Sequence, residues 1–112
     1  MAFLVLASLP NSRIKPRPST SLRDTKIAVT PSGIASLVAP ENINRTNIVL
    51  KNLDSVNSVW YGYDDQIDDQ SGNQGGMELK AGEAATIDVT TDIYVYQESG
   101  SNIEIGIDEG SG

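Results

Sequence analysis

Residues 93–107 read IYVYQESGSNIEIGI, and this stretch decides the fold class. In residues 93–97, Ile93 and Val95 alternate with two tyrosines, and residues 103–107 alternate isoleucine with smaller or polar side chains. A period of two residues is that of a β-strand with one buried face. The Ser-Gly-Ser-Asn sequence at 99–102 is typical of a turn. The stretch therefore predicts two short strands joined by a turn.

The same alternation of apolar and polar residues occurs along most of the chain on the N-terminal side of this stretch. Six further segments have strand character, at residues 25–30, 34–39, 45–53, 58–63, 77–80 and 84–89. In 45–53, Ile48 and Leu50 fall on one side, and Arg45, Asn47 and Lys51 on the other. About eight short strands with frequent turn signals predict an all-β fold, an antiparallel jelly roll or β-sandwich, and no helix. Residues 108–112 are expected to fray.

The N-terminal residues have a different composition from the rest of the chain. Pro10, Pro16 and Pro18 hold the backbone extended, and a proline also restricts the residue before it, here Lys15 and Arg17. We predict an extended, basic, proline-rich arm over residues 1–23 and a β-sandwich or jelly-roll body over residues 24–112. The apolar residues 1–9 lack a preceding basic region, so we interpret them as a strand that packs on a partner rather than an export signal.

Charge is divided unevenly between the two ends of a chain whose net charge is -7. Residues 1–26 hold five basic residues against Asp24 alone, a balance of +4, and residues 27–112 hold three basic residues against fourteen acids, a balance of -11. A positive arm on a negative body favours docking to other protein surfaces. The acidic body argues against nucleic acid and against an anionic membrane as partners.

Cysteine and histidine are both absent. The chain therefore forms no disulfide and has neither a thiolate nucleophile nor an imidazole base, which are the groups most often used in catalysis near neutral pH. We expect no enzymatic activity and no cofactor. Stability has to come from the core or from assembly with partners.

Four aspartates gather in residues 64–69, namely Asp64, Asp65, Asp68 and Asp69. Such a cluster could bind Ca²⁺ through carboxylate oxygens, although the acids are paired and do not fit an EF-hand loop. It could also be a solvated loop that keeps a sheet edge soluble. A glycosidase pair needs two carboxyl groups held at a fixed separation, which adjacent acids on an exposed loop seldom provide.

Five aromatic residues could form a platform on which sugars stack: Trp60, Tyr61, Tyr63, Tyr94 and Tyr96. On alternating strands, however, Trp60 points away from Tyr61 and Tyr63. We therefore expect about half of these rings in the core and half on the surface, in ordinary cross-strand pairs.

The segments NIVLKNLDSVNSVWYGY and GMELKAGEAATIDVTTDIYVYQESGSNIEIGI, separated by a glycine-rich loop, resemble small structural proteins of tailed bacteriophages. The likeness covers residues 47–107, and with the basic arm the layout is similar to capsid decoration proteins of the cement or staple type. The resemblance implies a jelly roll on the outside of a capsid in the virion, made in the host cytoplasm, with arms that cross between subunits. It implies as partners the major capsid protein and neighbouring copies of the chain, in many copies per assembly.

Several arm residues are the candidates for partner binding. They are Phe3, Leu4, Val5, Leu6, Arg13, Lys15, Arg17 and Arg23. The apolar ones could add as a strand to a neighbour's sheet edge. The alternative function is a carbohydrate-binding or host-attachment module that uses the aromatic residues and the acidic loop.

Overall fold

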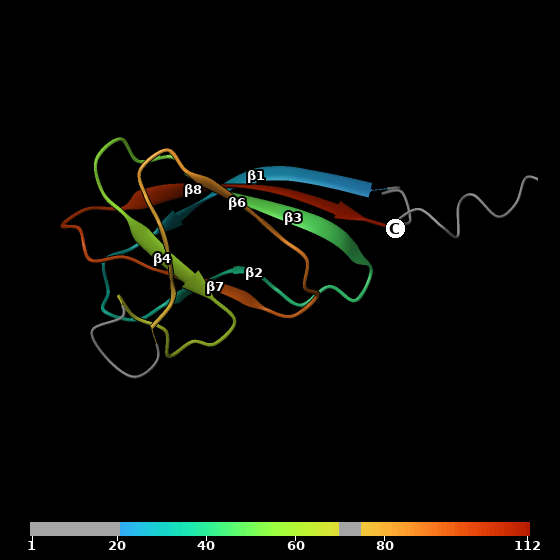
Figure 1. The fold of residues 1–112 in the computed structure, drawn as a ribbon, viewed down its shortest axis with the longest axis horizontal. Coiled ribbons are helices and arrows are strands. Elements are labelled where there is room, and N and C mark those ends of the chain that lie inside the picture. The colour runs from blue at the N-terminus through green and yellow to red at the C-terminus, as the bar shows by residue number, and fades with distance from the viewer. Residues whose placement is uncertain (1–20, 70–74) are drawn as a thin grey trace, which may run out of the picture.

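The computed structural model describes residues 21–69 and 75–112, and it confirms the all-β fold class. Within these residues eight strands follow one another, and Figure 1 shows their arrangement. They are β1 (Ser21–Val29), β2 (Ser36–Ala39), β3 (Arg45–Asn52), β4 (Val59–Gly62), β5 (Met77–Leu79), β6 (Ala84–Ile87), β7 (Ile93–Tyr96) and β8 (Ile103–Ser111).

The strands form two four-stranded antiparallel sheets, in the orders β1-β8-β3-β6 and β2-β7-β4-β5. Every connection except that between β4 and β5 passes from one sheet to the other. The first and last strands therefore lie side by side, and each sheet combines strands that are distant in the sequence. This strand order is that of an eight-stranded jelly roll, one of the two architectures that the sequence predicted.

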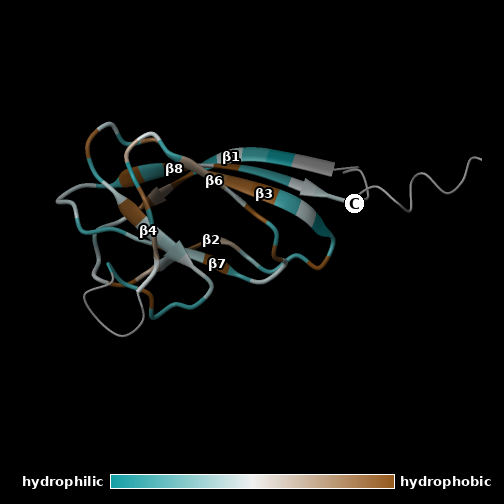
Figure 2. Cartoon of the chain, in the orientation of Figure 1, coloured by the Kyte–Doolittle hydropathy of each residue, from teal (hydrophilic) through white to brown (hydrophobic). Residues whose placement is uncertain are grey.

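The core lies between the two sheets and is built from the alternating residues of the longest strands. Ile103, Ile105 and Ile107 of β8 are almost completely buried, and Ile93 and Val95 of β7 lie in the same cluster. Figure 2 shows these apolar segments as brown bands on the facing strands. A fully buried isoleucine or valine contributes about 1.5–3 kcal/mol through its removal from water, so the alternation that predicted the strands also supplies the energy that joins the sheets.

The two ends of the described chain are more ordered than the sequence indicates. Ser21, Leu22 and Arg23, which we assigned to the arm, belong to β1. Residues 108–111, which we expected to fray, belong to β8. The two segments order each other. Ser21 lies opposite Ser111 and Arg23 lies opposite Glu109, so the backbone groups of each segment form hydrogen bonds with those of the other. Neither segment has an alternating apolar pattern of its own that would have predicted this pairing.

Arg45 differs most from its predicted position. Alternation along β3 placed it on the same side as Asn47, which is exposed, yet Arg45 is buried. The register of β3 against β8 shifts between these two residues, and such an irregularity reverses the alternation at the end of the strand. Ile48 and Leu50 lie beyond the shift and are buried as predicted.

Candidate functional site

The outer surface of the β2-β7-β4-β5 sheet carries an unusual group of large side chains. Trp60 of β4 lies opposite Tyr96 of β7, and Leu37 of β2 lies opposite Tyr94 of β7. The rings of Trp60 and Tyr96 are in contact, with centroids 6.4 Å apart and planes tilted by 59°. We call these four residues the aromatic face. All four are accessible to solvent, since none of them is buried.

The remaining aromatic candidates lie elsewhere. Tyr61 packs against the core from the inner side of β4. Tyr63 follows the strand and is exposed. Trp60 and Tyr61 therefore point to opposite sides of the sheet, as the alternation predicted, and the aromatic face consists of side chains from three different strands.

Residues 64–69, the acidic loop, fold back over the end of β4, with the side chains of Asp64, Asp65 and Gln66 exposed. Ile67 is buried at 7% exposure because its side chain covers Gly62. A β-carbon on Gly62 would lie 2.8 Å from Cγ2 of Ile67, so only glycine allows this approach. The amide of Gly76 donates to the carbonyl of Asp68 at 3.0 Å. The amide of Gln66 donates to Oδ1 of Asp64 at 2.7 Å. These contacts hold residues 64–69 at the end of β4, beside Tyr96 of the aromatic face.

A pocket of about 520 Å³ opens where the acidic residues meet the aromatic face. It is lined by Gly33, Ile34, Asp65, Gln66, Ile67, Asp68, Asp69 and Tyr96. Ile34, which is 64% exposed, forms an apolar wall from the chain that leaves β1. The pocket thus combines an aromatic ring, an apolar rim and three carboxylates.

Negative charge dominates the electrostatics of this region. Partial removal of the phenol from water raises the pKa of Tyr94, and the charges of Asp92, Asp65 and Asp64 raise it further. Burial likewise raises the pKa of Tyr96, with Glu98, Asp69 and Asp68 adding to the shift. A side-chain hydrogen bond with Asp69 raises the pKa of Glu98. Six carboxyl groups therefore act on two tyrosines, and such a field attracts cations.

The aspartates do not assemble into a metal centre. Within residues 21–69 and 75–112, no group of three or more acidic side chains is placed to hold a metal ion. The groups in this site are suited to binding a ligand. Its rings can stack on planar or cationic groups, and its carboxylates can accept hydrogen bonds.

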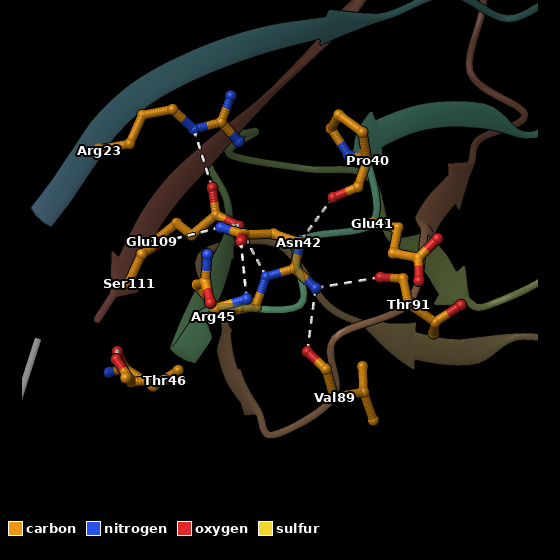
Figure 3. Close-up of polar contacts among 12 residues, drawn as sticks. Arg23, Pro40, Glu41, Asn42, Arg45, Thr46, Val89, Thr91, Glu109 and Ser111 are labelled. Atoms are coloured by element: carbon orange, nitrogen blue, oxygen red, sulfur yellow. Dashed lines mark hydrogen bonds and ion pairs between the residues drawn. The ribbon is translucent and has the colours of Figure 1, made fainter. Parts of the chain in front are cut away.

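A second polar cluster lies at the opposite end of β1 and is shown in Figure 3. Nε of Arg45 donates to Oε2 of Glu109 at 2.6 Å, and Nε of Arg23 lies 3.1 Å from Oε1 of the same carboxylate. The guanidinium of Arg45 also donates to three backbone carbonyls, those of Val89, Thr91 and Pro40, at 2.8 to 3.0 Å. We call Arg23, Arg45 and Glu109 the ion cluster. It joins β1, β3 and β8 to the chain that follows β2 and to the chain that precedes β7.

The predicted site residues lie in different parts of the chain. Phe3, Leu4, Val5, Leu6, Arg13, Lys15 and Arg17 lie outside the described residues. Arg23 is paired with Glu109, and its side chain remains 43% exposed. Asp64, Asp65, Asp68 and Asp69 lie beside the aromatic face.

Sequence reasoning missed Ile67, Asp92 and Glu98 as parts of the site, and it gave Arg45 no role. The one available signal was Ile67 itself, because an isolated isoleucine among four aspartates indicates a loop that buries one side chain.

Neither a protein-family model nor a curated protein matches the sequence. Among solved structures the chain is similar to one described as "Bacillus endospore appendages form a novel family of disulfide-linked pili". The TM-score is 0.49 at 12% identity, over 81% of this chain and 87% of that chain. The chain itself contains no cysteine for a disulfide link. In the described part of the chain, no helix has the length and apolar character needed to cross a membrane.

Replacement of Gly62 by alanine tests whether Ile67 holds the acidic loop in place. The new methyl group would displace Ile67, and overpacking of this kind costs about 1–3 kcal/mol. We expect faster hydrogen exchange at the amides of Ile67 and Gly76, measured by NMR, and a change in Trp60 fluorescence. Gly100→Ala is the matched control, since nothing lies within 4 Å of its added β-carbon. Unchanged exchange in Gly62→Ala would contradict this account of the loop.

Proposed function

We propose that this chain is a non-catalytic structural protein that attaches in many copies to the outer surface of a bacteriophage capsid and links neighbouring capsid subunits through its N-terminal arm. The observation that supports this most strongly is how the arm meets the body. The residue that follows the arm, Ser21, already belongs to β1, and β1 pairs with β8 through all of its nine residues. A force or a binding event on the arm therefore acts directly on the sandwich.

The ion cluster reinforces this junction. Glu109 is contacted by Arg23 from β1 and by Arg45 from β3, so three strands meet at the base of the arm. Arg45 is fully buried and its contacts are internal, which fits a role in stability rather than in recognition. The cluster thus ties the start of β1 to β3 and β8.

The arm itself has the composition of an attachment segment. Residues 1–20 contain Arg13, Lys15 and Arg17 and no acid, while residues 21–112 hold five basic residues against fifteen acids, a balance of -10. Twenty extended residues reach at most about 65–70 Å, which is enough to cross from one subunit to another. Many weak contacts of this kind, engaged together on a shell, give high avidity. The partners proposed are the major capsid protein and neighbouring copies of this chain.

Co-sedimentation with capsids that lack this protein tests the proposal. In the full chain, Arg13→Ser, Lys15→Ser and Arg17→Ser together should weaken attachment by about tenfold, since exposed ion pairs contribute about 0.2–1 kcal/mol each. The matched control replaces three exposed body cations, Lys26, Lys51 and Lys80, by serine and should attach almost normally.

Removal of the whole arm should have a larger effect than removal of its charges. The cut belongs after residue 20 rather than after residue 23, because Ser21 to Arg23 form the start of β1. We expect this truncated protein to unfold at nearly the same temperature as the full chain and to lose attachment. Attachment at full strength without residues 1–20, or equal loss in the body control, would show that the arm is not the linking element.

A further inference from the structure

We propose that the aromatic face and acidic loop of one copy form the docking site for residues 13–18 of the arm of a second copy. The inference rests on the proposed function, in which the arm makes the attachments, and it names the surface that receives the arm's basic segment. The apolar residues Phe3, Leu4, Val5 and Leu6 remain free to engage the capsid protein.

The backbone of the arm segment suits an aromatic surface. Its sequence is Arg-Ile-Lys-Pro-Arg-Pro, with Pro16 and Pro18 alternating with cations. Proline-rich segments adopt the extended polyproline II helix before they bind, so they lose little conformational entropy, and they dock on surfaces lined with aromatic rings. Trp60, Tyr94 and Tyr96 offer such a surface, spread over two adjacent strands.

The charges of the two surfaces are complementary. Arg13, Lys15 and Arg17 are the only charged side chains of residues 1–20. Six carboxyl groups surround Tyr94 and Tyr96. A guanidinium group can bind to such a surface in two ways at once. It donates hydrogen bonds to carboxylates, and it stacks on the face of an aromatic ring. Carboxylates and aromatic rings side by side therefore favour a cationic peptide, because both attract positive charge. A neutral sugar could stack on the rings and donate hydrogen bonds to the carboxylates, but it would gain nothing from the attraction between charges.

The distances along the chain indicate that the arm comes from a second copy. The pocket is lined by Gly33 and Ile34, which follow the C-terminal end of β1, while the arm precedes its N-terminal end. The eight steps from Ser21 to Val29 span about 27 Å. A fully extended chain from Ser21 reaches about 14 Å at Arg17 and about 21 Å at Lys15. In Figure 1, β1 begins beside the C-terminus, away from the loop that follows β4. The backbone at Arg17 and at Lys15 therefore stops short of the pocket of its own copy. The backbone at Arg13, at about 28 Å, only comes level with Val29, so residues 13–18 cannot all lie in that pocket.

Titration of the full chain with a synthetic peptide of residues 11–20 tests the inference. Trp60 is the only tryptophan, so its fluorescence reports on the aromatic face directly. We expect a saturable change that weakens as salt rises, because the attraction between exposed charges is screened. A peptide with serine at positions 13, 15 and 17 should bind at least tenfold more weakly, and a peptide with alanine at positions 16 and 18 should also lose affinity.

Variants of the full chain locate the site. Asp65→Asn with Asp68→Asn removes two carboxylates beside the aromatic face and should weaken peptide binding by about tenfold. Glu104→Gln with Asp108→Asn is the control, because it makes the same change of charge at exposed positions of β8, in the other sheet. Equal affinity of the two double variants would overturn the proposed site. If Trp60 did not respond to the peptide, or responded to neutral glycans instead, residues 13–18 would not be the segment that binds at the aromatic face.

The capsid experiment separates this inference from the proposed function. Attachment to capsids that depends on the arm, together with no peptide binding to the aromatic face, would overturn the inference alone. Attachment that does not depend on the arm would overturn the proposed function, whereas peptide binding at the aromatic face would still support contact between copies.

Discussion

Replacement of Arg45 by methionine is expected to lower the free energy of unfolding by about 3–5 kcal/mol, the cost of removing one partner of a buried ion pair. Methionine fills much of the volume but leaves Glu109 without its closest contact. It also leaves the carbonyls of Val89, Thr91 and Pro40 without the donors that Arg45 supplies. Urea denaturation followed by circular dichroism measures the loss, and we expect the midpoint to fall with little change in slope.

Arg23→Met is the informative control, because Arg23 contacts the same carboxylate from a side chain that is 43% exposed. Exposed pairs contribute at most about 1 kcal/mol. The two variants therefore remove the same kind of charge from the same cluster and should differ severalfold in effect. If Arg45→Met cost no more than Arg23→Met, the buried guanidinium would not be the element that holds β3 to the neighbouring chain segments.

Glu109→Gln is expected to have the second largest effect, a loss of about 2–3 kcal/mol at pH 7, since hydrogen bonds to charged groups contribute about 1.5–3 kcal/mol. Glutamine keeps the shape of the side chain and accepts a hydrogen bond from Arg45, but it removes the charge. Lys51→Gln, an exposed site on β3, should change the free energy of unfolding by less than about 0.5 kcal/mol.

The same variant should alter how stability depends on pH. Burial tends to raise the pKa of Glu109, but hydrogen bonds and charge from Arg45, with help from Asn42 and Arg23, outweigh burial and lower the pKa below 4.5. The unfolded chain then binds the proton more readily, so the stabilisation is complete above about pH 4.5 and is lost as the pH falls through the folded value. The normal protein should lose stability below pH 4.5, and Glu109→Gln should lose less of it. Parallel pH profiles for the two proteins would contradict this role of Glu109.

Local patterns predicted the fold wherever a strand has one buried face. The inner face of β8 was predicted from the alternating residues Ile103, Ile105 and Ile107. The outer face of β7 was predicted from Tyr94 and Tyr96. The patterns failed where a contact is distant in the sequence. Nothing near Glu109 indicates that it pairs with Arg23 and Arg45, and alternation cannot anticipate a register shift such as the one beside Arg45.

The candidate site was predicted in its parts but not in its arrangement. The sequence pointed to the aspartates and to the aromatic residues as separate candidates, and alternation correctly placed Trp60 and Tyr61 on opposite sides of the sheet. The expectation that about half of the five rings lie in the core was wrong, because only Tyr61 packs against it. The two groups come together because residues 64–69 turn back over the end of β4, where Ile67 packs on Gly62 and the amide of Gly76 donates to the carbonyl of Asp68. Packing between a side chain and a glycine five residues earlier leaves no periodic pattern, so only the structure reveals that carboxylates and rings share one surface.

The pairing of β1 with β8 has a mechanical consequence for a protein that is pulled by its arm. Tension applied to Ser21 along the axis of β1 would load the hydrogen bonds of the whole register in shear, because all nine residues of the strand are paired. Tension applied at right angles would instead open the ladder one pair at a time, like a zipper. The ion pair of Arg23 with Glu109 stands at the end where such an opening would begin. In the proposed attachment through residues 1–20, the sandwich would be held as in a lap joint, strongest against tension along the axis of β1.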